Sequence, residues 1–271
     1  SPMTGLTNEQ TKLRSNEMVG PRLYLMRVES PLICSAILPG QFVHMRIPGM
    51  PDHVLRRPFS VYAWDTETGV MDILYQVVGY GTDHLTQLQP NDRLANDIEL
   101  IGPIGNAWAP SKDSAGFQPA KSLIVGGGAG APAVFMLAKQ LHEAGKQVDA
   151  VLGAATKDAL VCMERYQQLL GEEHVFVATD DGSFGRAGFC TSLVEERLAE
   201  GYDYIATCGP NPLMRIVAEL AQKAGAFCEV STERKMACGV GACLSCVVDT
   251  TEGKKRSCVD GPIFDSKKVI W

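Results

Sequence analysis

Four cysteines near the C-terminal end constrain the fold of this chain more than any other feature. Their spacing is C-x4-C-x2-C-x11-C, formed by Cys238, Cys243, Cys246 and Cys258. This is the plant-type ligand spacing of a [2Fe-2S] cluster, for which thiolates are soft, charged donors. Structural zinc is the alternative, although zinc folds usually pair two C-x2-C knuckles and only one short pair is present here. The tail therefore predicts a small metal module with these four cysteines as ligands.

The remaining cysteines indicate packing rather than disulfide bonds. The chain has nine cysteines, an odd number, and its N-terminus lacks the positive-then-apolar pattern of a secretory signal. A disulfide framework is therefore not expected. Because free cysteine is among the most buried residue types, we expect core positions for Cys34, Cys162, Cys190 and Cys228.

Length and charge limit the classes of function. At 271 residues the chain is long enough for two domains and a small appendage. The net charge is −6, with 25 Lys and Arg against 31 Asp and Glu, whereas a nucleic-acid partner needs a basic surface. No apolar run reaches the roughly 18 residues of a membrane-spanning helix. We expect a cytoplasmic protein with no nucleic acid and no membrane as partner.

The segment from about residue 20 to 106 consists of short apolar runs broken by Gly, Pro and Asp, which predicts a small antiparallel barrel or sandwich. Arg57-Pro58-Phe59-Ser60 lies on one predicted strand, and a later strand runs into the turn Gly79-Tyr80-Gly81-Thr82 before a short helix expected around 83–88. A fixed cation beside a helix N-terminus is what a pyrophosphate requires. Taken alone, the motif is a weak signal, because a single arginine is usually a solvated surface residue.

At Ser122 the pattern changes to strands that alternate with helices, which predicts a doubly wound parallel sheet. The glycine run 126–130 follows a strand and opens a helix, the context of a dinucleotide fingerprint, although Ala131 departs from strict G-x-G-x-x-G. Asp149 lies at the start of the next strand, so it cannot be the ribose-binding acid. After that strand come Ala154 and Ala155, with no arginine for a 2′-phosphate, which favours NAD over NADP. A tight turn without ligand is the alternative.

The predicted fold class is thus multi-domain, β followed by α/β. It comprises an antiparallel flavin-binding β-barrel (1–108), a doubly wound parallel-sheet nucleotide domain (109–229) and a small C-terminal [2Fe-2S] module (230–271). The segment 109–121 reads as a linker because it is rich in Pro, Ser and Gly.

In combination, RRPFS, GYGT, GGGAGAP, ATDDGSFG, TCGPNPLM and ERKMACGVGACLSC resemble the ferredoxin reductase superfamily. Within it, the chain is most similar to the electron transfer subunits of type B dihydroorotate dehydrogenases. The resemblance implies FAD contacts at Arg57 (pyrophosphate), Pro58, Phe59 and Ser60 (isoalloxazine), Leu74, Tyr75 and Gln76 (ribityl and adenosine portions), and Gly81 and Thr82 (phosphates). It implies NAD contacts at Gly127, Gly128, Gly130, Asp181, Gly209 and Pro210, with Cys208 catalytic at the nicotinamide–flavin junction.

The cofactors implied are FAD, a [2Fe-2S] cluster and NAD. A nicotinamide exchanges two electrons as hydride, whereas the cluster passes one, and a flavin between them can do both. The resemblance also implies a partner, an FMN-containing catalytic subunit that oxidises dihydroorotate, in a heterotetramer of two chains of each kind. Alone, the chain is expected to reduce dyes with NADH and to leave dihydroorotate unchanged.

Two other functions stay open at this point. One is the small subunit of another NAD(P)H:ferredoxin-type oxidoreductase or of a sulfide dehydrogenase. There the first cluster ligand is expected to be an aspartate, and the cysteine at position 238 argues against this. The other is a non-enzymatic redox-sensing or zinc module on a nucleotide-binding scaffold.

Overall fold

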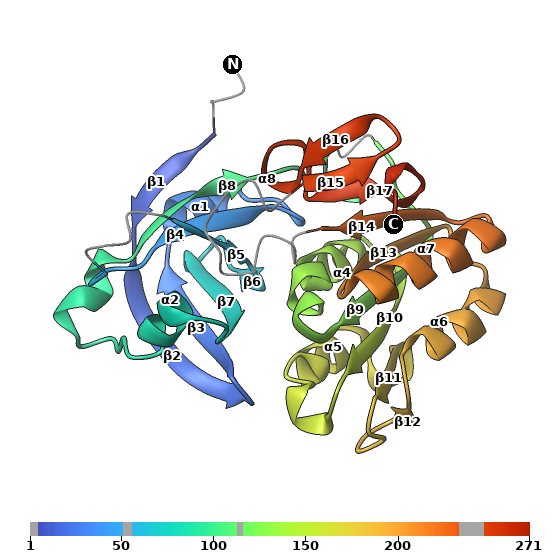
Figure 1. Ribbon diagram of the computed structural model, residues 1–271, viewed down its shortest axis with the longest axis horizontal. Helices are drawn as coiled ribbons and strands as arrows, with labels where there is room; N and C mark the ends of the chain where they lie inside the picture. The colour runs from blue at the N-terminus through green and yellow to red at the C-terminus, as the bar shows by residue number, and fades with distance from the viewer. Residues whose placement is uncertain (1–4, 51–55, 113–115, 233–246) are drawn as a thin grey trace.

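Two large units lie side by side, and the C-terminal segment lies across the upper side of the molecule between them (Figure 1). The computed structural model describes residues 5–50, 56–112, 116–232 and 247–271. Within these ranges no helix is long and apolar enough to cross a membrane.

The N-terminal unit consists of two four-stranded antiparallel sheets, ordered β1-β8-β4-β5 and β2-β3-β7-β6, as an antiparallel barrel or sandwich predicts. The strands are β1 (Thr7–Gln10), β2 (Lys12–Gly20), β3 (Leu23–Glu29), β4 (Phe42–Arg46), β5 (Arg57–Ser60), β6 (Ala63–Trp64), β7 (Val70–Gln76) and β8 (Glu99–Ile104). The two short helices are α1 (Pro31–Ala36) and α2 (Tyr80–Leu85). Helix α2 begins earlier than predicted because the Thr82 hydroxyl accepts hydrogen bonds from the amides of Val78 and Gly79, which starts the helix at Tyr80.

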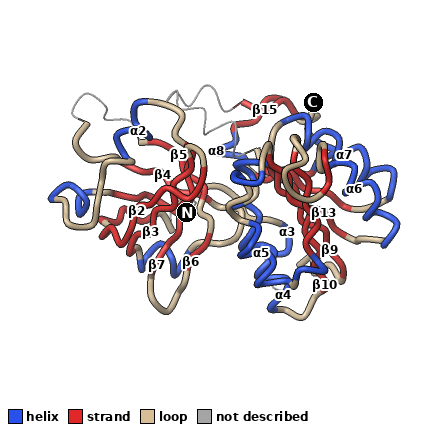
Figure 2. The backbone as a smooth tube through the Cα atoms, turned by 90° about the horizontal axis from the view of Figure 1, so that it is seen from below, coloured by secondary structure: helices blue, strands red, loops and turns tan. Residues whose placement is uncertain are grey.

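The second unit is a seven-stranded sheet ordered β12-β11-β10-β9-β13-β14-β17, parallel from β12 to β14. The strands are β9 (Lys121–Gly127), β10 (Gln147–Ala154), β11 (Val175–Thr179), β12 (Arg186–Ala187), β13 (Tyr204–Cys208) and β14 (Phe227–Ser231). The helices are α3 (Ala109–Lys112), α4 (Phe135–Glu143), α5 (Met163–Leu170), α6 (Thr191–Arg197) and α7 (Asn211–Ala224). Helices cover both faces of the sheet (Figure 2), and one apolar core lies on each face. The doubly wound prediction is confirmed.

The C-terminal segment joins the same sheet. It contains the hairpin of β15 (Val247–Thr250) and β16 (Gly253–Arg256), the one-turn helix α8 (Ser257–Asp260) and β17 (Ile263–Asp265). Strand β17 pairs antiparallel with β14. The boundary predicted between 229 and 230 needs correction, since it falls inside β14. The boundary between the two domains is better drawn after β14, because β17 of the C-terminal segment pairs with the end of that strand.

Candidate cofactor-binding site

The strand order reverses at β9: β10 to β12 are added on one side of it, and β13 and β14 on the other. The glycine loop follows β9 at this point. Strands β9 and β13 are neighbours, with Gly126 opposite Cys208 at their carboxyl ends. In open α/β sheets a ligand binds at this switch point. The loops that follow the strands, 128–131 and 209–210, are therefore placed together as the sequence predicts.

Close packing explains why this loop is built from glycine. A Cβ on Gly130 would lie 2.2 Å from the carbonyl oxygen of Cys208, and one on Gly126 would lie 2.6 Å from Cα of Ala131. Gly128 has φ +53° and is exposed, as is Ala129. The buried glycines bring the two strand ends together, and the exposed part of the loop is left to face a ligand.

A cleft separates this loop from the barrel. It is open to solvent, and its lining includes Leu74 and Gln76 of β7 and Gly128 and Ala129 of the loop. Two predicted FAD-side residues, Leu74 and Gln76, and one predicted NAD-side residue, Gly128, thus line the same cleft.

On the barrel, Arg57 and the Gly79–Thr82 turn come together although they are distant in sequence. A Cβ on Gly81 would lie 2.5 Å from Cζ of Arg57, so the guanidinium rests directly on this glycine. The Thr82 hydroxyl accepts from two amides and donates to the Gly79 carbonyl, and the residue is 5% exposed. Its side chain holds the turn in shape, which leaves main-chain groups of the turn and Arg57 for the predicted phosphate contact.

Strand alternation divides the predicted FAD residues. Tyr75 is 4% exposed, and its hydroxyl donates to Oδ1 of Asn16 at 2.8 Å. Burial raises the pKa of Tyr75. Its ring also contacts Phe59, which lies in the barrel core as well. Both side chains belong to the barrel core, so main-chain atoms of Tyr75 and Phe59 are the better placed groups for the predicted FAD contacts, which stay predictions. Pro58 and Ser60 are half-buried on β5.

Asp181 lies in an exposed loop after β11. Its carboxylate accepts from the hydroxyl and the amide of Ser183, and these bonds lower the pKa of Asp181. The Ser183 hydroxyl in turn accepts from the amide of Lys157 in the loop after β10. The Lys157 ammonium lies 5.7 Å over the Phe184 ring. These two loops form one surface at the carboxyl end of the sheet, where the ribose of a dinucleotide is expected.

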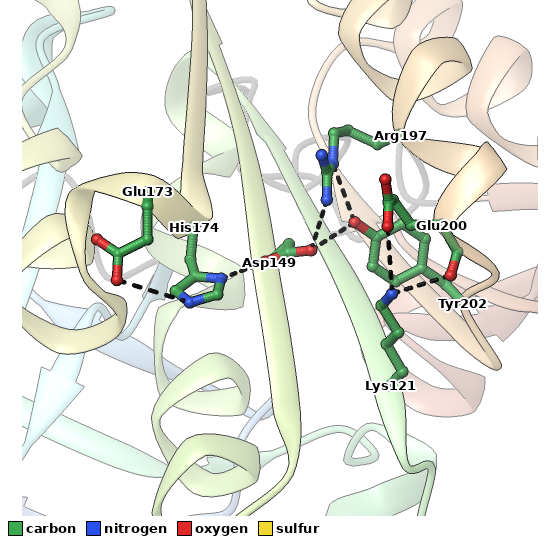
Figure 3. A network of polar contacts seen from close by, with 7 residues as sticks. All are labelled: Lys121, Asp149, Glu173, His174, Arg197, Glu200 and Tyr202. Carbon is green, nitrogen blue, oxygen red and sulfur yellow. Dashed lines mark hydrogen bonds and ion pairs between the residues drawn. The ribbon is translucent and has the colours of Figure 1, made fainter.

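Asp149 lies at the amino end of β10, away from that surface, as predicted. Its carboxylate accepts hydrogen bonds from Tyr202 at 2.6 Å, from Arg197 at 3.1 Å and from His174 at 2.7 Å (Figure 3). Burial alone would raise the pKa of Asp149, but these three partners outweigh it and lower the pKa. The residue stabilises the sheet and does not face a cofactor.

The cysteines separate into two groups. Cys34, Cys162, Cys190 and Cys228 are buried as predicted, and burial raises each thiol pKa, to about 11 for Cys190 and about 12 for the others. Cys208 ends β13 at the switch point but is 2% exposed and packs in a core. Its catalytic role stays a prediction.

Three of the four predicted cluster ligands, Cys238, Cys243 and Cys246, lie outside the described residues. Cys258 is described: it is the second residue of α8, is partly exposed and packs against Phe42 of the barrel. Within the described ranges no three His, Cys, Asp or Glu side chains gather as a metal site. The four-thiolate set therefore rests on the sequence spacing.

One contact between the units had no signal in the sequence. Arg165 of α5 donates to Asp72 of β7 at 2.8 Å, and its guanidinium lies 4.8 Å over the Tyr62 ring and 5.1 Å over the Phe135 ring. Asp72 also accepts from Arg27. No local spacing could reveal a pair so distant along the chain, and it fixes the nucleotide unit against the barrel.

Replacing Gly81 with alanine tests the FAD cradle. The new methyl would displace the Arg57 guanidinium, so we expect FAD to bind about tenfold to a hundredfold more weakly, since a hydrogen bond to a charged group contributes roughly 1.5–3 kcal/mol. FAD fluorescence on dilution measures the affinity. Gly79→Ala is the control, because its Cβ would meet nothing within 4 Å and its φ of −175° is open to any residue. Equal FAD affinity in the two variants would exclude the role of Arg57.

Comparison with known proteins places these features in context. Residues 233–270 match the family described as the iron-sulfur cluster binding domain of dihydroorotate dehydrogenase B. The chain is 37% identical over 265 residues to the dihydroorotate dehydrogenase B (NAD(+)) electron transfer subunit of Bacillus caldolyticus, covering 97% of this chain and 98% of that protein. It is 36% identical to the same subunit of Desulforamulus reducens, covering 94% and 95%.

Solved structures agree with this at the level of the fold. An NADH-dependent reduced ferredoxin-NADP oxidoreductase superposes with a TM-score of 0.79 at 28% identity, covering 97% of this chain and 90% of that chain. A ferredoxin NADP+ reductase from Neisseria gonorrhoeae, solved with FAD and NADP, gives a TM-score of 0.63 at 13% identity, over 83% and 93% of the two chains. The two-unit architecture is thus that of reductases of this fold.

Proposed function

Because the chain belongs to the family of electron transfer subunits of dihydroorotate dehydrogenase B, we propose that it carries electrons from a dihydroorotate-oxidising catalytic subunit to NAD+. The cofactors are FAD and a [2Fe-2S] cluster of the chain itself, and the FMN belongs to the partner. The single observation that carries the proposal is the cleft that brings β7 and the glycine loop face to face, in a chain whose tail has the cluster spacing.

The residues present fit these groups. The Gly81–Arg57 contact leaves no room for a side chain at position 81 and holds the guanidinium beside the turn that starts α2. The exposed Gly128–Ala129 loop at the switch point leaves main-chain groups for a dinucleotide, and four thiolates suit iron. When bound, FAD exchanges a hydride with nicotinamide and single electrons with the cluster, so it links the two kinds of transfer.

The chain's own residues bind and orient. Arg57 supplies charge to the FAD pyrophosphate, Pro58 and Ser60 lie along the isoalloxazine, and Leu74 and Gln76 face the cleft. Gly127, Gly128, Gly130, Gly209 and Pro210 admit the nicotinamide dinucleotide between the ends of β9 and β13, with Cys208 beside the nicotinamide and Asp181 toward the ribose. In this proposal no side chain of the chain donates or removes a proton from a substrate.

Reconstitution tests the division of labour. The purified chain should reduce artificial dyes with NADH and form no orotate from dihydroorotate. Adding an FMN-bearing dihydroorotate dehydrogenase subunit should restore NAD+-linked turnover, in a complex with two chains of each kind by light scattering. Orotate formation by the chain alone would contradict the assignment of that chemistry to the partner.

Discrimination between NADH and NADPH is a separate prediction. Ala154 ends β10 and Ala155 follows it, with no arginine next to them in the sequence, and the Lys157 ammonium lies over the Phe184 ring. We expect kcat/KM for dye reduction to favour NADH by about tenfold, which needs about 1.4 kcal/mol. Ala155→Arg should narrow the ratio of the two kcat/KM values, and Lys146→Arg, at a partly exposed position at the other end of the sheet, should not. A preference of the unaltered chain for NADPH would overturn the assignment.

A second candidate function is that of a subunit of an NAD(P)H:ferredoxin-type oxidoreductase. It is supported by the TM-score of 0.79 with the NADH-dependent reduced ferredoxin-NADP oxidoreductase. Identity over nearly the whole chain is higher to the dihydroorotate dehydrogenase B subunits, 37% against 28%. Cysteine at position 238, where we expect an aspartate in the other class, points the same way. The reconstitution above separates the two functions.

A further inference from the structure

Asn106, two residues after the end of the last barrel strand, β8, holds the C-terminal segment by three hydrogen bonds. The backbone amide of Asn106 donates to the Gly261 carbonyl at 2.9 Å. Its side-chain amide donates to the Ile263 carbonyl at 2.8 Å and accepts from the Ile263 amide at 2.9 Å. One side chain thus satisfies both backbone groups of Ile263, as a neighbouring strand would.

Ile263 is the first residue of β17, so it is held from two sides. Ser231 of β14 is its partner in the sheet. The adjacent Pro262 carbonyl accepts from the amide of Thr232 at 2.8 Å and from its hydroxyl at 3.0 Å. Asn106 therefore joins the barrel to a strand whose opposite side belongs to the nucleotide unit.

The residues around Asn106 and Pro262 are closely packed. A Cβ on Gly105 would lie 2.7 Å from Cδ of Pro262 and 3.0 Å from Cε1 of Phe42. The Gly105 carbonyl also accepts from the Gln41 side chain at 2.9 Å. Because the interior is close-packed, a change in these contacts shifts the segment as a body.

The segment held in this way includes Cys258. That cysteine packs against Phe42 of β4, and Phe42 is the register partner of Ser60 on β5. A predicted cluster ligand thus contacts a fully buried aromatic side chain of the strand that pairs with a predicted flavin-lining strand.

We propose that Asn106 is a positioning residue that holds the Cys258 segment against the flavin-binding barrel and thereby sets the rate of electron passage between cluster and flavin. This inference rests on the proposed function and assigns a role to a side chain that touches neither cofactor. An amide is required because it donates and accepts at once, whereas a carboxylate only accepts and leucine does neither.

The first measurement reports on the contact itself. Asn106→Asp removes the donor to Ile263 and Asn106→Leu removes both partners without changing the size of the side chain much. In the purified chain, hydrogen exchange of a peptide containing Ile263 should be faster by about tenfold in the leucine variant, because a hydrogen bond of roughly 1.5 kcal/mol is lost. Asn96→Asp, an exposed residue of the same unit, is the matched control and should exchange as the unaltered chain does.

The second measurement reports on electron passage. After rapid mixing with NADH, visible absorbance follows reduction of flavin and cluster in one chain. In both Asn106 variants we expect the rate of flavin reduction and the cluster spectrum before mixing to be unchanged. The rate of cluster reduction should be lower by about tenfold or more, as when contacts that orient a metal site are removed. The aspartate variant should lie between leucine and the unaltered chain.

The outcomes are distinguishable. If the unaltered chain contains flavin and cluster but the leucine variant reduces its cluster at the same rate, the role of Asn106 is refuted and the proposed function stands. If the unaltered chain shows no cluster at all, the proposed function fails first. Loss of the cluster spectrum in both variants would make Asn106 a folding residue and would also refute the positioning role.

Discussion

Serine in place of Cys258 is expected to remove the cluster while FAD stays bound. A serine hydroxyl is a harder donor that loses its proton far less readily than a thiol, so it is a poor substitute for a thiolate ligand of iron. In the barrel, Cys258 packs against Phe42. The unaltered chain, purified without oxygen, should contain about two iron and two acid-labile sulfides. The variant should contain neither, reduce ferricyanide with NADH at the normal rate, and support no turnover with the catalytic subunit.

Two controls sharpen this result. Cys34→Ala removes a buried thiol of α1 that is outside the tail, and it should leave iron and sulfide content unchanged. Metal analysis of the unaltered chain also decides between the alternatives for the tail. One zinc per chain without labile sulfide would refute the iron–sulfur assignment.

Among the substitutions proposed for this chain, Asp149→Asn is expected to lower the free energy of unfolding the most. The substitution leaves Arg197 without its counterion and disrupts the bonds from Tyr202 and His174. Breaking a fully buried pair costs roughly 3–5 kcal/mol, and because Arg197 and His174 are partly exposed we expect about 2–3 kcal/mol here. Thermal unfolding should then occur about 5–10 °C lower. Asp158→Asn, at an exposed position of the same unit, should shift the midpoint by less than about 2 °C.

The contacts of Asp149 also predict how the stability of the chain depends on pH. Because the pKa of Asp149 is lowered in the folded chain, its contribution is fully present above the ordinary aspartate pKa of about 4 and is lost as the pH falls through the lowered value. The difference in midpoint between the unaltered chain and Asp149→Asn should persist as the pH falls to 5 and should shrink below about pH 4. A difference that grows on acidification would contradict this role of Asp149.

How far the sequence predicts this structure depends on the range of the interactions. The glycine loop, Arg57 and the alternating strands and helices are local patterns, so the two units, their order and the switch point follow from them. Tyr75 and Phe59 were expected at FAD because of their motifs, whereas period-2 alternation turns both side chains into the core. Pairs such as Arg165 with Asp72, or Asn106 with Ile263, join distant segments and leave no periodic trace, so only the fold shows them.

The pairing of β17 with β14 also bears on solubility. A parallel sheet that ended at β14 would present a free row of amides and carbonyls beside the apolar positions Cys228 and Val230, and such an edge recruits strands from other molecules. Strand β17 covers this edge, and it is only three residues long, carries Asp265 and is followed by Lys267 and Lys268. Short length and charge are the features by which natural sheets discourage further pairing. A chain clipped ahead of Ile263 would therefore be prone to aggregate through its nucleotide-binding sheet, even with that sheet otherwise intact.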